Sequence, residues 1–123
     1  MPTIAIIGAS TNRAKFGNKA VRAYVEEGWE VLPVNPREER IEGLEVIAAV
    51  DEIPLGVDRV SLYLPPTVTA KLLEALASRR PQEVWLNPGT ADGEVRRKSD
   101  ELGLPVIEAC SIVAIGHRPS EYP

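Results

Sequence analysis

The 123-residue sequence predicts an α/β fold, a three-layer α/β/α sandwich in which a mostly parallel, doubly wound sheet lies between two layers of helices. Short apolar runs alternate with amphipathic stretches along the chain, and short connections between them favour right-handed crossovers between parallel strands. The first run, residues 3–7, is apolar without interruption, as expected for a strand covered on both faces. Neither a linker nor a repeat interrupts this pattern. The prediction is therefore one domain, residues 1–123.

The first half of the chain provides two strands and a helix. Residues 3–7 form the first strand, and residues 18–27 form a helix with Asn18 as its N-cap and Gly28 as its stop. The buried face of this helix is predicted to carry Ala20, Val21, Tyr24 and Val25. The second strand lies within residues 29–36 and ends at a turn dipeptide, Asn35-Pro36. Residues 37–56 are less regular and predict a short strand or turn followed by a brief helix.

The second half repeats the alternation. Residues 58–66 alternate apolar and polar positions before two prolines that cannot continue a strand. Thr67 is the expected cap of a helix over residues 68–79, whose buried stripe would be Val68, Leu72, Ala75 and Leu76. A strand and turn follow at residues 83–89, and then a helix over residues 91–103 that Gly103 ends. The last strand is expected within residues 105–110.

Composition excludes several classes of function. A net charge of −4 and a pI near 5.1 argue against sequence-independent binding of nucleic acid. One cysteine and one histidine allow no internal disulfide and speak against a metal site. No apolar stretch approaches the roughly 20 residues of a membrane helix, and the N-terminus lacks the basic region of a signal peptide. The expected location is the cytoplasm, with no membrane partner.

Small or turn-forming residues follow each predicted strand. In an open parallel sheet, ligands bind outside the carboxyl ends of the strands, at the point where the strand order reverses. These ends should therefore lie near one another although they are distant in sequence. They are Gly8-Ala9-Ser10, Asn35-Pro36, Leu64-Pro65-Pro66, Asn87-Pro88-Gly89 and Ala109-Cys110-Ser111.

The turn after the first strand has the chemistry of a phosphate site. A helix start preceded by small residues favours an anion through its free N–H groups and its dipole, and Arg13 and Lys15 add positive charge. The turn is not the dinucleotide fingerprint, since only Gly8 of its three glycines is in place, and no Walker pattern is present. After the second strand stands Asn35, not the acidic residue of an NAD site, and Arg37 favours a phosphate on the ribose. The alternative is a tight strand-to-helix turn whose basic side chains face water.

Several segments together resemble a known family. They are the Gly8-Ala-Ser turn, Lys15-Phe16-Gly17, "VLPVNP" at residues 31–36, and "VWLNPG" with "GLPVIEAC" near the end. In order and spacing they are similar to small stand-alone CoA-binding proteins, which are similar to the CoA-binding domain of succinyl-CoA synthetase α-subunits and of NDP-forming acyl-CoA synthetases. The resemblance covers nearly the whole chain. It implies a Rossmann-like fold that binds coenzyme A in an extended groove along the strand ends.

The resemblance also implies a role for each strand end. Gly8, Ala9, Ser10 and Arg13 would form the phosphate site, with Lys15 adding charge. Asn35, Pro36 and Arg37 would border the adenosine and its 3′-phosphate. Leu64, Pro65 and Pro66 would line the adenine or pantetheine side, and Asn87, Pro88 and Gly89 the pantetheine path. Cys110 would lie near the pantetheine thiol, where it could form a mixed disulfide, act as a nucleophile or simply be a small buried apolar residue.

No catalytic residue is assigned. The ligases that the chain resembles have a second domain with a phosphorylated histidine, and the only histidine here, His117, lies in a tail that does not match that loop. The leading hypothesis is a non-enzymatic module that binds coenzyme A or an acyl-CoA. One alternative is an NADP-dependent oxidoreductase that uses Ser10, Thr11 and Arg37 at a 2′-phosphate. The other is a detached regulatory or ligase subunit that needs a protein partner, and a homodimer is also open.

Overall fold

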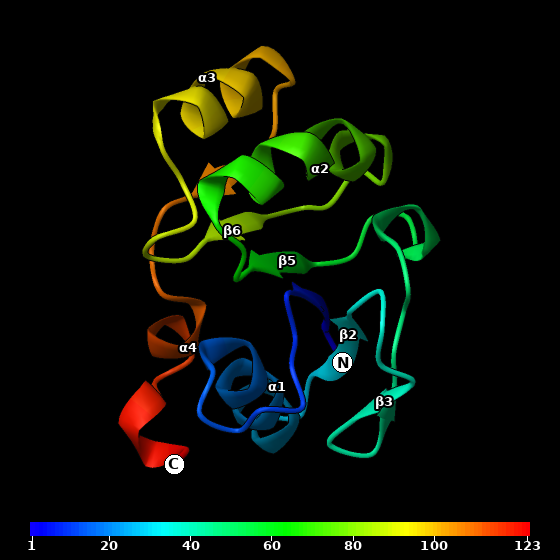
Figure 1. Ribbon diagram of the computed structural model, residues 1–123, viewed down its shortest axis with the longest axis vertical. Helices are drawn as coiled ribbons and strands as arrows, with labels where there is room; N and C mark the ends of the chain where they lie inside the picture. Colours follow the sequence, from blue (N-terminus) through cyan, green and yellow to red (C-terminus); the bar gives the residue numbers. More distant parts are fainter.

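The computed structural model describes residues 1–123 and confirms the predicted sandwich around a parallel sheet (Figure 1). The five strands lie in the order β2-β1-β5-β6-β7 and all pair in parallel. Their bounds are Thr3–Ile7 (β1), Glu30–Val34 (β2), Arg59–Leu62 (β5), Val84–Leu86 (β6) and Val106–Ile107 (β7). The chain passes from β1 to β2 on one side of it, and β5 then pairs on the other side of β1. The strand order therefore reverses between β1 and β5.

Helices cover both faces of this sheet. Figure 1 shows α1 and α4 on one side and α2 and α3 on the other, and α1 packs against α4 as α2 does against α3. Their bounds are Phe16–Glu26 (α1), Pro66–Ser78 (α2), Gly93–Glu101 (α3) and Ser111–Ala114 (α4). Two short 3₁₀ turns lie at Val50–Glu52 (η1) and Pro119–Glu121 (η2).

Strand β1 shows why an uninterrupted apolar run suits the middle of this sheet. Ile4 and Ile6 join the apolar cluster under α1, whereas Ala5 and Ile7 join the cluster under α2. All four side chains are buried. Both faces of the strand therefore need apolar residues, as the sequence predicts.

The irregular segment after β2 contains a small antiparallel hairpin, formed by β3 (Arg40–Ile41) and β4 (Leu44–Glu45). Glu42 and Gly43, the two residues between these strands, both have positive φ, as a two-residue type I′ turn requires. Ile41 is 1% exposed and anchors the hairpin to the cluster under α1. The short strand and brief helix expected here are confirmed as this hairpin and η1.

Two predicted helix caps are wrong. Helix α1 begins at Phe16, so Asn18 lies inside its first turn with a fully buried side chain. Helix α2 begins at Pro66, the first helical position at which proline is favoured, and Thr67 is not its cap. The predicted stops are confirmed: Gly28 and Gly103 follow their helices with φ of +84° and +67°.

The buried stripe of α2 is also displaced from its predicted position. Thr69, Ala70, Leu73 and Leu76 are its buried residues, so only Leu76 of the predicted four is fully buried. Val68 and Leu72 instead line a cleft at the end of the sheet. On α1 the predicted face is confirmed except for Val25, which is 49% exposed.

The C-terminal tail packs against α1. Tyr122 is buried, and the Arg22 guanidinium donates hydrogen bonds to the carbonyl oxygens of Tyr122 and Pro123 at 3.1 and 3.2 Å. His117 lies between Glu27, 2.6 Å from its Nε2, and Glu121. These carboxylates, Glu27 first, raise the pKa of His117 and so favour the charged form that joins tail to helix.

Candidate functional site

A cleft of about 1040 Å³ opens at the carboxyl end of the sheet, where the chain leaves β1 and β5 toward helices on opposite faces, α1 and α2. This is the switch point at which open α/β sheets bind ligands. Its volume is at the top of the range of about 300–1,000 Å³ for small-molecule sites, which suits a long ligand. Eleven of the fifteen predicted site residues line it: Gly8, Ala9, Ser10, Lys15, Asn35, Pro36, Leu64, Pro65, Pro66, Pro88 and Gly89.

Two glycines bring the turn after β1 against its neighbours. Gly8 has a φ of +88°, and a Cβ there would lie 2.8 Å from the Tyr63 carbonyl oxygen on β5's extension. A Cβ on Gly17 would lie 2.2 Å from the Gly8 carbonyl oxygen. The first turn of α1 therefore packs directly on the end of β1. Gly17 supplies the close helix–strand packing that the third glycine of the dinucleotide fingerprint supplies elsewhere.

Side chains of the turn hold its backbone in shape. The Ser10 hydroxyl accepts a hydrogen bond from the Asn12 N–H, and the Asn12 amide oxygen accepts one from the Ala14 N–H, both at 3.0 Å. The buried Asn18 donates to the Ser10 carbonyl oxygen at 2.9 Å. These hydrogen bonds restrain the turn, and a restrained binding loop loses less entropy when it binds a ligand.

This ordered backbone leaves N–H groups free. The N–H groups of Ala9, Ser10, Phe16 and Gly17 donate no hydrogen bond within the protein, and all four residues line the cleft. Phe16 and Gly17 begin α1, so the positive end of the helix dipole points toward the same space. Free amides at a helix start are a ready site for a phosphate group.

Lys15 is the only charged residue among those lining the cleft. The guanidinium of Arg13 lies outside the lining, with its Nε 3.5 Å from the Glu42 carboxylate. Arg37 also lies outside the lining, exposed and immediately after Pro36. The structure therefore brings Lys15 to the cleft and leaves the two arginines at its border.

Asn35 joins the turns that follow β1 and β2. Its amide nitrogen donates to the Ala9 carbonyl oxygen at 2.9 Å. Its amide oxygen accepts from the N–H groups of Arg37 and Glu38, at 2.8 and 3.2 Å. Both ends of the side chain are thus used within the protein, and Asn35 shapes the cleft wall beside Pro36.

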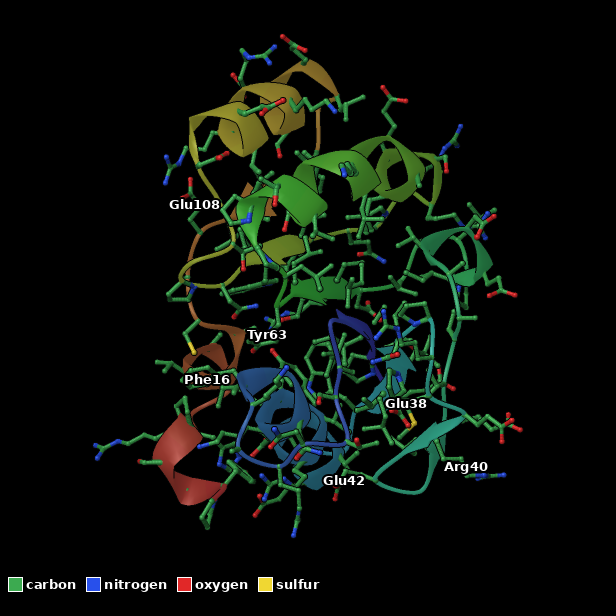
Figure 2. All side chains as sticks on the ribbon, viewed as in Figure 1. Phe16, Glu38, Arg40, Glu42, Tyr63 and Glu108 are labelled. Carbon is green, nitrogen blue, oxygen red and sulfur yellow. The ribbon has the colours of Figure 1, made fainter.

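Tyr63, which the sequence pattern does not assign to the site, forms part of the wall that follows β5. Its hydroxyl lies 3.1 Å from the Ser111 hydroxyl, and burial raises the pKa of Tyr63 to about 12. The phenol is therefore neutral at physiological pH. Figure 2 shows Tyr63 just below β5 and Phe16 lower, at the start of α1.

Asn87 lies behind the cleft and not in it. The side chain is 3% exposed and donates to the Ser61 hydroxyl and the Leu62 carbonyl oxygen, at 2.9 and 2.8 Å. Its amide oxygen accepts from the Ser111 N–H at 2.9 Å. Asn87 thereby connects the ends of β5 and β6 to the start of α4, while the following Pro88 and Gly89 reach the cleft.

The structure separates Cys110 and His117 from the cleft lining. Cys110 follows the short β7, is half-buried as the residue before α4, and packs beside the cluster under α1. His117 belongs to the tail described above. No group of three or more His, Cys, Asp or Glu residues is placed to hold a metal ion.

Some lining residues have no signal in the sequence. Ala48 and Ala49 come from the irregular segment between β4 and η1, and only the folded hairpin brings them to the cleft. Phe16 and Val68 do have a signal, since both are apolar residues in a helical first turn. They are 57% and 40% exposed and reach the cleft from α1 and α2, which cover opposite faces of the sheet.

No helix in the structure is both long and apolar enough to cross a membrane.

This chain is similar to several known proteins. Residues 2–116 match the family model described as the CoA binding domain. The chain is 29% identical over 110 residues to a trans-feruloyl-CoA synthase from an unknown prokaryotic organism. It is 40% identical over 63 residues to the alpha subunit of an ADP-forming acetate–CoA ligase II of Pyrococcus furiosus. These matches cover 87% and 50% of this chain but only 16% and 14% of the two relatives.

A solved structure resembles nearly the whole chain. A conserved hypothetical protein from Pyrococcus furiosus superposes with a TM-score of 0.85 at 33% identity, and the alignment covers 93% of this chain and 99% of that one. The two chains therefore share one fold over nearly their whole aligned length.

Proposed function

The chain belongs to the CoA binding domain family, and we propose that it binds coenzyme A, or an acyl-CoA, in the cleft at the ends of β1 and β5. The observation that carries the proposal is a set of four backbone N–H groups without a partner in the protein, in Ala9, Ser10, Phe16 and Gly17, residues that line one cleft with Lys15. These groups would receive the pyrophosphate, whose oxygens accept hydrogen bonds and whose charge the helix start favours.

The two arms of the cleft suit the two halves of the ligand. On the β2 side, Asn35, Pro36, Ala48 and Ala49 form a wall for the adenosine. Arg37, exposed beside this wall, is the expected partner of the 3′-phosphate. On the other side, Leu64, Pro65, Pro66, Pro88 and Gly89 form the expected path of the pantetheine.

The lining supports binding without catalysis in this domain. It includes no Asp, Glu, His or Cys, and the raised pKa of Tyr63, about 12, keeps that phenol from acting as a base near neutral pH. In the two CoA-using enzymes matched above, the aligned segment makes up 16% and 14% of the length. The proposal for this domain is binding, as a module that holds or senses the ligand.

Thermal unfolding with a panel of nucleotides tests the proposal. We expect CoA to raise the midpoint most, by about 10 °C at a hundred times its Kd. Dephospho-CoA should raise it less, because the 3′-phosphate and its contact with Arg37 are gone. NAD, NADP and ATP should have small effects. A clear shift with NADP and none with CoA would contradict the proposal and favour the oxidoreductase alternative.

A further inference from the structure

Glu42 occupies a backbone position that disfavours its side chain. It is the first of the two turn residues between β3 and β4, with a φ of +50°. Glycine, asparagine and aspartate are the usual residues there, since other side chains meet steric strain in the left-handed region. A strained residue persists only where surrounding contacts hold it in place. The contacts of the Glu42 side chain are the ones that could do so.

The Glu42 carboxylate reaches the turn between β1 and α1, residues 8–15. Its Oε2 accepts a hydrogen bond from the amide nitrogen of the buried Asn18 at 3.0 Å and lies 3.5 Å from Arg13 Nε. Asn18 in turn donates to the Ser10 carbonyl oxygen. Figure 2 shows Glu42 between the hairpin and α1, whereas Arg40 points away from the molecule. A negative charge therefore lies beside the turn that we expect to receive the pyrophosphate.

The two contacts of Glu42 differ in strength. Asn18 is fully buried and also accepts a 2.7 Å hydrogen bond from Arg22, so its position is well determined. The Arg13 side chain is 59% exposed, and its pair with Glu42 is long. Exposed ion pairs of this kind contribute little to the free energy of folding. A multiply charged phosphate can therefore replace the Glu42 carboxylate as the partner of the Arg13 guanidinium.

We propose that Glu42 limits the affinity of the site by competing with the ligand's pyrophosphate for Arg13. The inference rests on the proposed function. Without ligand, Glu42 holds the guanidinium at the outer side of the turn. With ligand, Arg13 turns to the phosphate, and Glu42 keeps only its hydrogen bond with Asn18. The carboxylate also repels the phosphate directly, and both effects weaken binding.

The test is calorimetric titration of CoA and dephospho-CoA into the wild type and Glu42→Gln. Glutamine keeps an oxygen that can accept from Asn18 but removes the charge. We expect about threefold to fivefold tighter binding of both ligands, because both carry the pyrophosphate and the change is that of an exposed ion pair. The gain should shrink at 0.5 M salt, where the Debye length is well below about 8 Å.

Two further variants isolate the competition. Glu45→Gln changes the net charge equally on the same hairpin, and Glu45 contacts neither Arg13 nor Asn18, so its affinity should stay near that of the wild type. In an Arg13→Ala background, Glu42→Gln should gain markedly less than in the wild type. Unchanged or weaker binding by Glu42→Gln, an equal gain with Glu45→Gln, or the full gain without Arg13 overturns the inference alone. A wild type that does not bind CoA overturns the proposed function and the inference with it.

Discussion

Replacement of Gly17 by alanine is expected to destabilise the protein by about 3 kcal/mol and to lower its melting temperature by about 10 °C. The added Cβ would lie 2.2 Å from the Gly8 carbonyl oxygen and 3.0 Å from its carbon, and both atoms belong to the backbone. The first turn of α1 must therefore move away from the end of β1. This movement would separate the free N–H groups of Phe16 and Gly17 from those of Ala9 and Ser10, so CoA binding should weaken as well.

The expected loss of stability is opposite to the usual effect of this substitution in a helix. Inside a helix, alanine normally stabilises relative to glycine by about 1 kcal/mol. Gly93, the first residue of α3, is a matched control because a Cβ there meets nothing within 4 Å. Gly93→Ala should leave the melting temperature unchanged or raise it slightly. Thermal unfolding by circular dichroism measures both variants, and a Gly17→Ala protein as stable as the wild type would contradict the packing described above.

Removal of the Asn87 side chain is expected to destabilise the protein by a similar amount, about 3 kcal/mol. Its three hydrogen bonds are buried, and their loss leaves the Ser111 N–H without a partner at the start of α4. The Leu62 carbonyl oxygen keeps the Thr90 hydroxyl, and the Ser61 hydroxyl keeps that of Ser111. The main effect of Asn87→Ala should therefore fall on α4.

A thiol assay distinguishes this local effect from general destabilisation. Cys110 immediately precedes α4 and is half-buried, so loosening of the helix should speed its reaction with a disulfide reagent below the melting temperature. Thr90→Val is the control, because it removes one hydrogen bond to an oxygen that Asn87 still satisfies, and about 1 kcal/mol is expected. Equal stabilities of Asn87→Ala and Thr90→Val would show that Asn87 does not anchor α4.

The fold is predictable because the hydrophobic periodicity and the turn-forming residues indicate the same elements along most of the chain. The apolar run at residues 4–7 follows from burial on both faces, and Gly28 and Gly103 have the left-handed conformations that end helices. The caps predicted at Asn18 and Thr67 are wrong because cap chemistry is a local signal that longer-range contacts can override. The Asn18 side chain is used by Ser10, Arg22 and Glu42, the last of them 24 residues away.

The position of the site is predictable from the sequence, but the contacts that its residues make are less so. Strand ends converge in a parallel sheet, so Gly8, Pro65 and Gly89 can be grouped from the sequence alone. Asparagines at strand ends resemble ligand contacts in sequence, but Asn35 and Asn87 use their side-chain atoms within the protein. The helical pattern places Val68 and Leu72 in the core, because an apolar residue that lines a cleft has the same periodicity as one that faces a sheet.

A crystal structure of the wild type with CoA tests the central claim most directly. We predict that CoA lies in the cleft at the ends of β1 and β5, with its pyrophosphate accepting hydrogen bonds from the N–H groups of Ala9, Ser10, Phe16 and Gly17. The adenosine should lie on the Pro36 side and the pantetheine along Pro65 and Pro88. CoA bound elsewhere on the molecule, or a cleft that stays empty at saturating CoA, would contradict the account.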